Sequence, residues 1–255
     1  MYPEAKKSLG QNFLNGGRTI EHIVDCMDVI TDFAVLEIGP GRGVLTKELL
    51  KKGFTVYAVE TDRDLIKILQ QELQAEIALK KLILIEGDIT NFDYEKFIPE
   101  KFQIVANIPF YITGMILRRI FEGSTILPQK VCLIMQKEVA KRIVKDDGDS
   151  SILSHSIELY GTAKYVKTIS RGSFSPAPKV DGGLLCIYDI HTPEISCESS
   201  EFFELVKTLY HMPRKTIRNN LFETKFEIIL KNLSEEMLQR RPETLTLGEI
   251  KKMIQ

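Results

Sequence analysis

FAVLEIGPGRG, residues 33–43, is the stretch that decides the fold of this chain. Its opening apolar run predicts a buried strand, and the glycines that follow allow a tight turn into a helix. Four more β-rich runs, separated by helical patterns, follow at residues 55–59, 82–85, 102–106 and 131–135. Strands that alternate with helices at this spacing predict an α/β fold with a parallel, doubly wound, Rossmann-like sheet.

The segments on either side of this region have different patterns. Ahead of the first strand, apolar residues on one helical face predict a covering helix: Ile20, Ile23, Val24, Met27 and Ile30. From about His191 a polar stretch leads into helical patterns with no further strand. We therefore expect one domain over residues 1–190, with a basic arm at 1–18, and a small all-helical subdomain over 191–255.

The composition excludes several classes of protein. The chain has 255 residues, 44% of them hydrophobic, and its 34 basic residues nearly balance its 35 acidic ones. Its longest apolar runs are far shorter than the roughly 18 residues that span a bilayer, and its start lacks the apolar core of a secretory signal. The four cysteines form no Cys-x-x-Cys pair, and the histidines lack zinc-ligand spacing. We expect a cytoplasmic protein without membrane segment, disulfides or metal.

The glycine cluster and two acidic residues predict a nucleoside site. Glu60 ends the second strand, 21 residues after Gly39, where a carboxylate can accept both ribose hydroxyls. Asp88 ends the third strand, within reach of an adenine edge. The spacing Gly-x-Gly-x-Gly, preceded by Glu37, favours S-adenosylmethionine over a nicotinamide cofactor. A dehydrogenase or an ordinary strand-to-helix turn is the alternative.

Asn107-Ile108-Pro109-Phe110, after the fourth strand, predicts methyl transfer to an exocyclic amine. Such an amine is a poor nucleophile because its lone pair is delocalised into the ring. The Asn107 side-chain carbonyl and the Ile108 backbone carbonyl can accept both amine hydrogens, which orients the lone pair and stabilises the developing charge. Phe110 offers a stacking face worth about 1–3 kcal/mol, and Pro109 fixes φ and removes a competing donor. Alone, the tetrapeptide could also be a capped turn with a core phenylalanine.

Basic residues are clustered although the net charge is only −1. Residues 160–180 and 205–222 each contain four basic side chains, and acids are absent from the stretches that carry them. With Lys6, Lys7 and Arg18 of the arm, they predict a phosphate-binding face. The RNA contacts we expect from these stretches are Lys179, Arg214, Lys215 and Arg218.

Phe174 begins a proline-containing loop within the first basic stretch. It could close the other side of a flipped adenine, opposite Phe110. The alternative is a loop that packs one aromatic side chain into the core.

Several segments together resemble the ribosomal RNA adenine N6-dimethyltransferase family: residues 9–14, 36–43, 59–60, 87–88, 107–110 and 174–180. Residues 214–219 and 241–245 look more like the branch that acts on 16S RNA of the small subunit than the macrolide-resistance branch that acts on 23S RNA. The resemblance implies S-adenosylmethionine-dependent dimethylation of two adjacent adenosines in a hairpin near the 3′ end of 16S rRNA. The partner would be the immature small ribosomal subunit, and we expect the enzyme to be a monomer.

The resemblance also implies roles for individual residues. Cofactor contacts fall on Asn12, Leu14, Gly39, Glu60, Asp88 and Asn107. The target-base pocket would consist of Asn107, Ile108, Phe110 and Phe174. The chain departs from the family at Phe110, where tyrosine is usual, and at Gly182, which replaces a serine. Two alternatives stay open: the same chemistry on 23S RNA, and an RNA-binding ribosome-assembly factor with little turnover.

Overall fold

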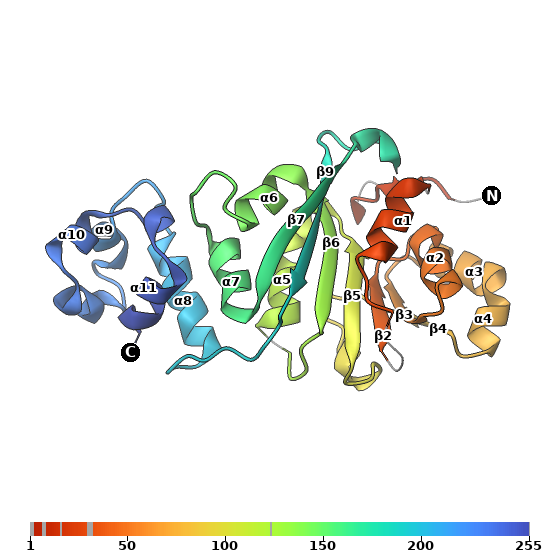
Figure 1. The fold of residues 1–255 in the computed structure, drawn as a ribbon, viewed down its shortest axis with the longest axis horizontal. Coiled ribbons are helices and arrows are strands. Elements are labelled where there is room, and N and C mark those ends of the chain that lie inside the picture. Colours follow the sequence, from red (N-terminus) through yellow and green to blue (C-terminus); the bar gives the residue numbers. More distant parts are fainter. Residues whose placement is uncertain (1–2, 7–8, 16, 30–32, 123, 255) are drawn as a thin grey trace. The chain divides into compact units, whose positions relative to one another are not determined.

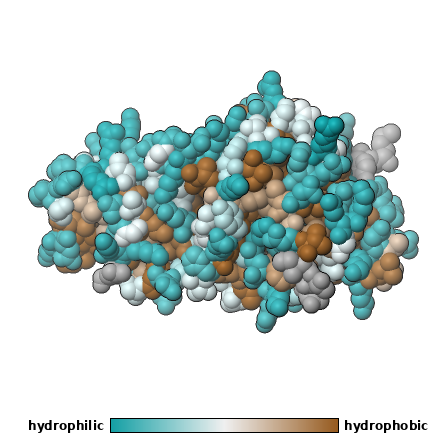
Figure 2. Space-filling view, viewed as in Figure 1, coloured by the Kyte–Doolittle hydropathy of each residue, from teal (hydrophilic) through white to brown (hydrophobic). Residues whose placement is uncertain are grey.

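Figure 1 shows the computed structural model of the chain, which describes residues 3–6, 9–15, 17–29, 33–122 and 124–254. The chain forms two compact units, residues 1–140 with 164–190 and residues 141–163 with 191–255. Hydrophilic side chains cover much of the surface that faces the viewer in Figure 2. Within the described ranges, no helix is long and apolar enough to span a membrane.

The first unit is built on a seven-stranded sheet with the order β4-β3-β2-β5-β6-β9-β7. The strands are β2 (Ala34–Ile38), β3 (Thr55–Glu60), β4 (Leu82–Glu86), β5 (Phe102–Asn107), β6 (Lys130–Gln136), β7 (Thr162–Ile169) and β9 (Gly182–Tyr188). Five of them are parallel, and Ile38 at the end of β2 pairs with Val59 on one side and Ala106 on the other. The strand order reverses between β2 and β5, so a topological switch point lies at their carboxyl ends.

The five predicted strands are confirmed, but the sheet is not wholly parallel. Strand β9 runs antiparallel to β6, and neither β7 nor β9 was predicted. Strand β7 lies at the sheet edge, where exposed residues alternate with half-buried ones, so it lacks the apolar run of a central strand.

Helices of the first unit cover the sheet: α1 (Arg18–Asp25), α2 (Val44–Lys51), α3 (Arg63–Glu72), α4 (Gln74–Ala78), α5 (Thr113–Phe121) and α6 (Lys137–Ile143). Helices α1 and α2 lie side by side, and their apolar residues share one core cluster with Val35 and Val105 of the sheet (Figure 1). The predicted covering helix ends at Asp25, although Met27 is still buried, and Ile30 lies outside the described residues.

A two-stranded sheet connects the N-terminal arm to a distant loop. Strand β1 (Phe13–Leu14) pairs antiparallel with β8 (Phe174–Ser175), and Leu14 lies opposite Phe174. The residues just before β1 are thereby held beside the carboxyl edge of the main sheet, where β5 continues into the 3₁₀ turn η3 (Phe110–Ile112).

The second unit is helical, with α7 (Ile152–Tyr160), α8 (Ser199–Leu209), α9 (Ile217–Leu221), α10 (Glu235–Gln239) and α11 (Leu247–Met253). Residues 141–163, which we expected in the first domain, cluster with this unit because their side chains pack within it. The Tyr160 ring stacks on Phe203 with centroids 6.2 Å apart, and Ser150 Oγ donates to the Leu245 carbonyl.

His155 forms a buried polar contact in the second unit. Its Nε2 lies 3.1 Å from the Tyr210 hydroxyl, which donates to the Pro242 carbonyl at 2.8 Å. The Tyr210 hydroxyl has a single hydrogen, which goes to Pro242, so Nε2 of His155 carries the imidazole hydrogen. Nδ1 is buried without a hydrogen-bond partner in the described chain. Burial lowers the pKa of His155 to about 4.

We predict that the free energy of unfolding falls as the pH is lowered from 6.5 toward 4, since the unfolded chain then binds a proton that the folded chain excludes. In His155→Gln the amide can still donate to Tyr210. This variant should lose this pH dependence of the free energy of unfolding, measured with urea across that range. The exposed His211→Gln serves as the matched control and should keep it. A full slope in His155→Gln would contradict the assignment.

Candidate active site

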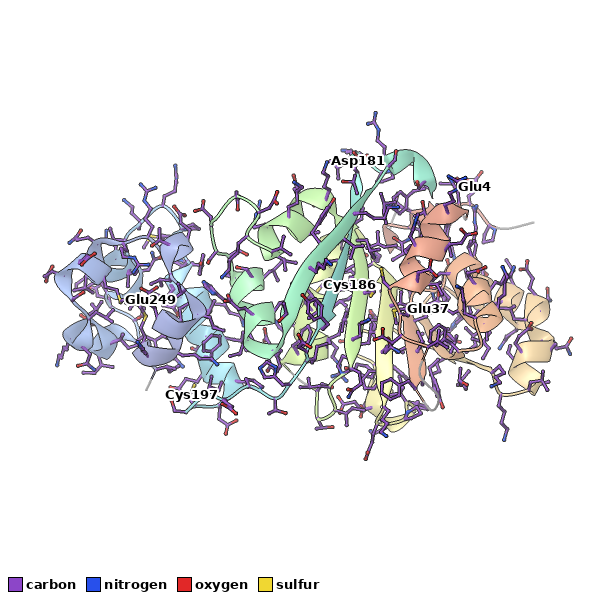
Figure 3. The ribbon with its side chains drawn as sticks, in the orientation of Figure 1. Glu4, Glu37, Asp181, Cys186, Cys197 and Glu249 are labelled. Carbon is purple, nitrogen blue, oxygen red and sulfur yellow. The ribbon has the colours of Figure 1, made fainter. Side chains whose placement is uncertain are left out.

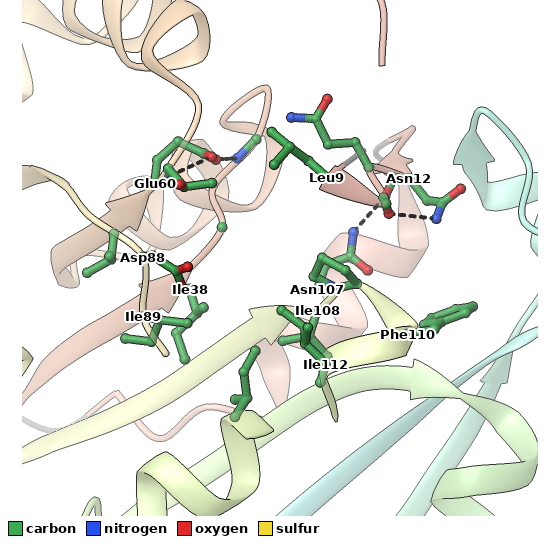
Figure 4. Close-up of a pocket in the computed structure, with 18 of the residues that line it drawn as sticks. Leu9, Asn12, Ile38, Glu60, Asp88, Ile89, Asn107, Ile108, Phe110 and Ile112 are labelled. Carbon is green, nitrogen blue, oxygen red and sulfur yellow. Dashed lines mark hydrogen bonds between the residues drawn. The ribbon is translucent and has the colours of Figure 1, made fainter. Parts of the chain in front are cut away.

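A cavity of about 780 Å³ opens at the carboxyl ends of β2 to β5. Its walls come from residues 9–13 of the arm, the turns after β2, β3 and β4, and the segment 107–112 (Figure 4). The position is the switch point at which doubly wound sheets bind ligands.

The glycine turn after β2 is shaped by left-handed backbone conformations, with φ of +69° at Gly39, +58° at Gly41 and +71° at Gly43. A Cβ on Gly41 would lie 2.9 Å from the Phe13 ring, and one on Gly43 would lie 2.5 Å from Leu69. A Cβ on Gly39 would meet nothing within 4 Å, so the backbone there is open to a ligand in the cavity.

Glu60 joins the glycine turn to the turn after β3. Its Oε2 accepts the Gly41 amide at 3.0 Å, and its Oε1 accepts the amides of Thr61 and Asp62, both at 2.9 Å. Burial raises the pKa of this carboxyl even though three backbone donors oppose the shift. We expected Glu60 to accept two ribose hydroxyls; with three of its four lone-pair sites used, one site on Oε2 remains for a ligand.

Asp88 and Ile89 form the part of the cavity that follows β4. Asp88 Oδ1 accepts both the amide and the hydroxyl of Thr90, at 2.9 and 2.8 Å, which fixes the carboxylate at the cavity rim. Ile89 is buried, and with Ile38 it supplies apolar surface on which a planar ring can lie.

Asn107 has a defined orientation. Its Nδ2 donates to the Asn12 carbonyl at 2.9 Å, so its Oδ1 is left as an acceptor and points to the side of the cavity that holds Phe110 (Figure 4). The Ile108 amide donates to the Ile134 carbonyl, which extends the β5–β6 ladder into the tetrapeptide. Phe110 is half-buried and lines the same cavity.

Two predicted site residues lie in the core. Phe174 is 3% exposed and is absent from the described cavity walls, and its expected place opposite Phe110 stays a prediction. Its pairing with Leu14 turns both side chains into the core cluster, and Leu14 lines only a smaller adjacent cavity of about 320 Å³. A Cβ on Gly182 would lie 3.3 Å from the Phe174 ring, which is a tight contact.

Glu37 is a site residue whose role the sequence did not reveal. It is 1% exposed within β2 (Figure 3), it lines the smaller cavity beside Gly39, and its Oε2 has no hydrogen-bond partner in the described residues. Burial raises the pKa of this carboxyl to about 8. A charged residue inside an apolar strand run was the available signal, because such a residue is rare without a partner.

The residues expected to contact RNA differ in their surroundings. Lys179, Arg214 and Lys215 are exposed, whereas Arg218 donates to both carboxylate oxygens of Glu235. Lys6 of the arm is paired with two carboxylates, so its charge is already balanced, and Lys7 lies outside the described residues.

The loop that carries Arg214 and Lys215 is held by a buried side chain. Asn220, 3% exposed, accepts the Met212 amide at 2.8 Å and donates to the carbonyls of Met212, Lys215 and Thr216. This contact gives the two basic residues a defined backbone while their side chains remain in solvent.

Comparison with known proteins places this geometry in a family. The family model described as ribosomal RNA adenine dimethylase matches residues 3–251. Two relatives are named ribosomal RNA small subunit methyltransferase A. The protein from Mycoplasmopsis pulmonis is 39% identical over 85% of this chain and 83% of its own length. The protein from Dehalococcoides mccartyi is 35% identical over 98% of this chain and 87% of its own length.

Two solved structures share the fold. A dimethyladenosine transferase from Plasmodium falciparum has a TM-score of 0.75 at 23% identity and covers 94% of this chain and 95% of its own. The 23S rRNA methyltransferase ErmE has a TM-score of 0.70 at 24% identity, over 95% and 99%. These likenesses confirm the predicted α/β fold class. With the family model spanning nearly the whole length, this chain belongs to the ribosomal RNA adenine dimethylase family.

Proposed function

We propose that this protein transfers methyl groups from S-adenosylmethionine to N6 of two adjacent adenosines near the 3′ end of 16S rRNA, during assembly of the small ribosomal subunit. The observation that carries the proposal is the Asn107 amide, which is turned by Asn12 so that Oδ1 faces the base side of the cavity. The relatives that are 33–39% identical are named for the small subunit, whereas the 23S enzyme supports only the fold.

The residues of the cavity fit the cofactor. Asp88 and Ile89 suit its adenine, the free site on Glu60 Oε2 suits a ribose hydroxyl, and the open backbone at Gly39 admits its chain. The Glu37 Oε2 atom, which has no hydrogen-bond partner among the described residues, suits the ammonium group. When bound, S-adenosylmethionine supplies an electrophilic methyl group on a positively charged sulfur.

The tetrapeptide then acts on the adenine amine. Asn107 Oδ1 and the Ile108 carbonyl accept its hydrogens and aim the nitrogen lone pair at the methyl carbon. As the N–C bond forms and the S–C bond breaks, these carbonyl dipoles stabilise the positive charge on nitrogen until a proton leaves to solvent. Phe110 provides the stacking face, and this needs no hydroxyl, so phenylalanine can serve in place of tyrosine.

We also propose that RNA is bound through phosphate contacts of Lys179, Arg214 and Lys215, and that Arg218 contributes less because Glu235 already pairs with it. The described residues contain no group of three or more potential metal ligands. We propose a cytoplasmic monomer, since each unit buries a core of its own.

The deciding experiment supplies labelled S-adenosylmethionine to immature small subunits and, separately, to protein-free 23S RNA, and maps the modified nucleotides. Label in two adjacent adenines of 16S rRNA supports the proposal. Label only in 23S RNA would favour the resistance-type activity, and no label in either RNA with cofactor still bound would favour an assembly factor.

Asn107→Ala should lower the rate of methyl transfer about 10²–10³-fold, because the amine loses its principal acceptor. Affinity for RNA should change less than about threefold, since the phosphate contacts lie elsewhere. Single-turnover methylation and filter binding measure the two effects. Asn91→Ala, at an exposed position outside the cavity, is the matched control, and full activity in Asn107→Ala would remove this residue from the mechanism.

Affinity for RNA should depend steeply on salt. Arg214→Ala and Lys215→Ala should each lower the slope of log K against log salt by about 0.7–0.9, as expected for one lost phosphate contact. Arg218→Ala should lower it less, because that guanidinium is shared with Glu235. Slopes that stay unchanged in the first two variants would refute the proposed phosphate contacts.

Affinity for S-adenosylmethionine should rise with pH up to about 8, because Glu37 must lose its proton to pair with the ammonium group. Glu37→Gln should bind the cofactor more weakly and without this rise. Calorimetry in the absence of RNA measures both effects. A pH profile shared by the variant and the unmodified protein would show that Glu37 does not face the cofactor.

A further inference from the structure

The arm side of the cavity is attached differently from its other walls. The turns after β2, β3, β4 and β5 continue from strands of the hydrogen-bonded sheet, but residues 9–12 precede the short pairing of β1 with β8. We call residues 9–13, which all line the cavity, the arm segment. In Figure 4, Leu9 of the arm segment lies between Glu60 and Asn12.

Side chains hold the arm segment in place. At one end, Asn107 Nδ2 donates to the Asn12 carbonyl at 2.9 Å. Next to it, Gln11 Nε2 donates to Asp62 Oδ2 at 2.9 Å. Lys6, which precedes the arm segment, donates from Nζ to Asp62 Oδ1 at 2.6 Å. Gln11 Oε1 in turn accepts the Lys6 amide at 2.7 Å, so these three residues form one network.

Two lesser contacts also reach the arm segment. The Arg42 guanidinium lies 4.5 Å from the centre of the Phe13 ring, and the Tyr111 ring is close enough to Gly10 that a Cβ there would approach it to 2.6 Å. Arg42 and Tyr111 thus contact the arm segment through a ring face and a glycine, whereas Asp62 makes charged hydrogen bonds, which are the stronger kind.

Asp62 also belongs to the turn that holds Glu60. Its amide donates to Glu60 Oε1 at 2.9 Å, and its Oδ1 accepts the Asp64 amide at 3.1 Å as the N-cap of α3. Asp62, whose side chain is only 1% exposed, therefore binds the arm segment through its carboxylate and Glu60 through its backbone amide. The burial of the Asp62 carboxylate strengthens its hydrogen bonds, although the side chain of Lys6 is itself 40% exposed.

Transfer of two methyl groups requires that the spent cofactor leave and a fresh one enter between the transfers. We propose that Asp62 is a positioning residue that clamps the arm segment over the cofactor cavity and thereby sets the rate of cofactor exchange. Through the rate of cofactor exchange, Asp62 also controls the proportion of mono- and dimethylated adenosine. This part of the proposal rests on the proposed function.

Asp64 provides a matched comparison. It also binds Lys6 Nζ, at 2.8 Å, but its side chain is 58% exposed, and no hydrogen bond among the described residues joins its carboxylate to Gln11 or Glu60. Exposed ion pairs contribute little. Loss of the Asp64 carboxylate should therefore leave the clamp closed.

The first test measures binding of S-adenosylmethionine and S-adenosylhomocysteine to the full chain without RNA. Asp62→Ala should raise the dissociation rate and Kd of both about tenfold, the effect of one lost charged hydrogen bond. The double variant Lys6→Ala/Gln11→Ala, which keeps the Asp62 cap of α3, should do the same, and Asp64→Ala should stay within about twofold. If Asp62→Ala fails to fold, the double variant decides.

Unchanged dissociation in the double variant would overturn the clamp, because any effect of Asp62→Ala would then come from the turn that holds Glu60. Unchanged dissociation in Asp62→Ala would overturn it as well. Thermal unfolding of the ligand-free variants serves as a check that the arm, and not the whole unit, has loosened.

The second test follows methylation of the RNA. The double variant should show a raised KM for S-adenosylmethionine and, at saturating cofactor, more dimethyladenosine per RNA-binding event. An unchanged product ratio with faster exchange would overturn the control of dimethylation. If the unmodified protein binds cofactor but methylates no adenosine, the proposed function fails while the clamp measured in the first test stands.

Discussion

The Glu60 carboxylate is the interaction on which the site depends. It accepts amides from the turns after β2 and β3, so two segments 19 residues apart are held by one buried carboxyl group. Burial raises the pKa of this carboxyl, and the three backbone donors oppose that rise. The left-handed glycines are compatible with this arrangement because they let the Gly41 amide turn toward the carboxylate.

The Asn107 side chain likewise serves two purposes, on the side of the cavity that holds Phe110. Asn107 uses its amide nitrogen to hold the arm and leaves its oxygen as a free acceptor, so one side chain both builds the wall and is available for the role we propose for it. Two residues join the arm to strand ends. Asp62 contacts Gln11 of the arm and Glu60, and Asn107 contacts the Asn12 carbonyl of the arm. The arm side of the cavity is thus held by polar side-chain contacts that can break, whereas the floor of the cavity is formed by the hydrogen-bonded sheet.

Much of this could be predicted because its causes are local. Apolar runs and glycines identify strands β2 to β6 and the turn after β2, since strand burial and positive φ constrain residue type at each position. Residues at strand ends, such as Glu60, Asp88 and Asn107, could be placed together because parallel strands end at one edge. Strands β7 and β9 escaped prediction, since edge position and antiparallel pairing with β6 are decided by distant partners.

By itself the sequence determined the α/β fold, the cofactor class and the residue types that act on an amine. Only the tertiary structure decided that Phe174 packs with Leu14 in the core, that Lys6 is paired with Asp62, and that Oε2 of Glu37 has no hydrogen-bond partner among the described residues. The physical reason is that a motif specifies what a side chain can do, whereas burial and pairing depend on segments far away in the chain. Residues 14 and 174, for example, pair although 160 positions separate them, and no local pattern shows this.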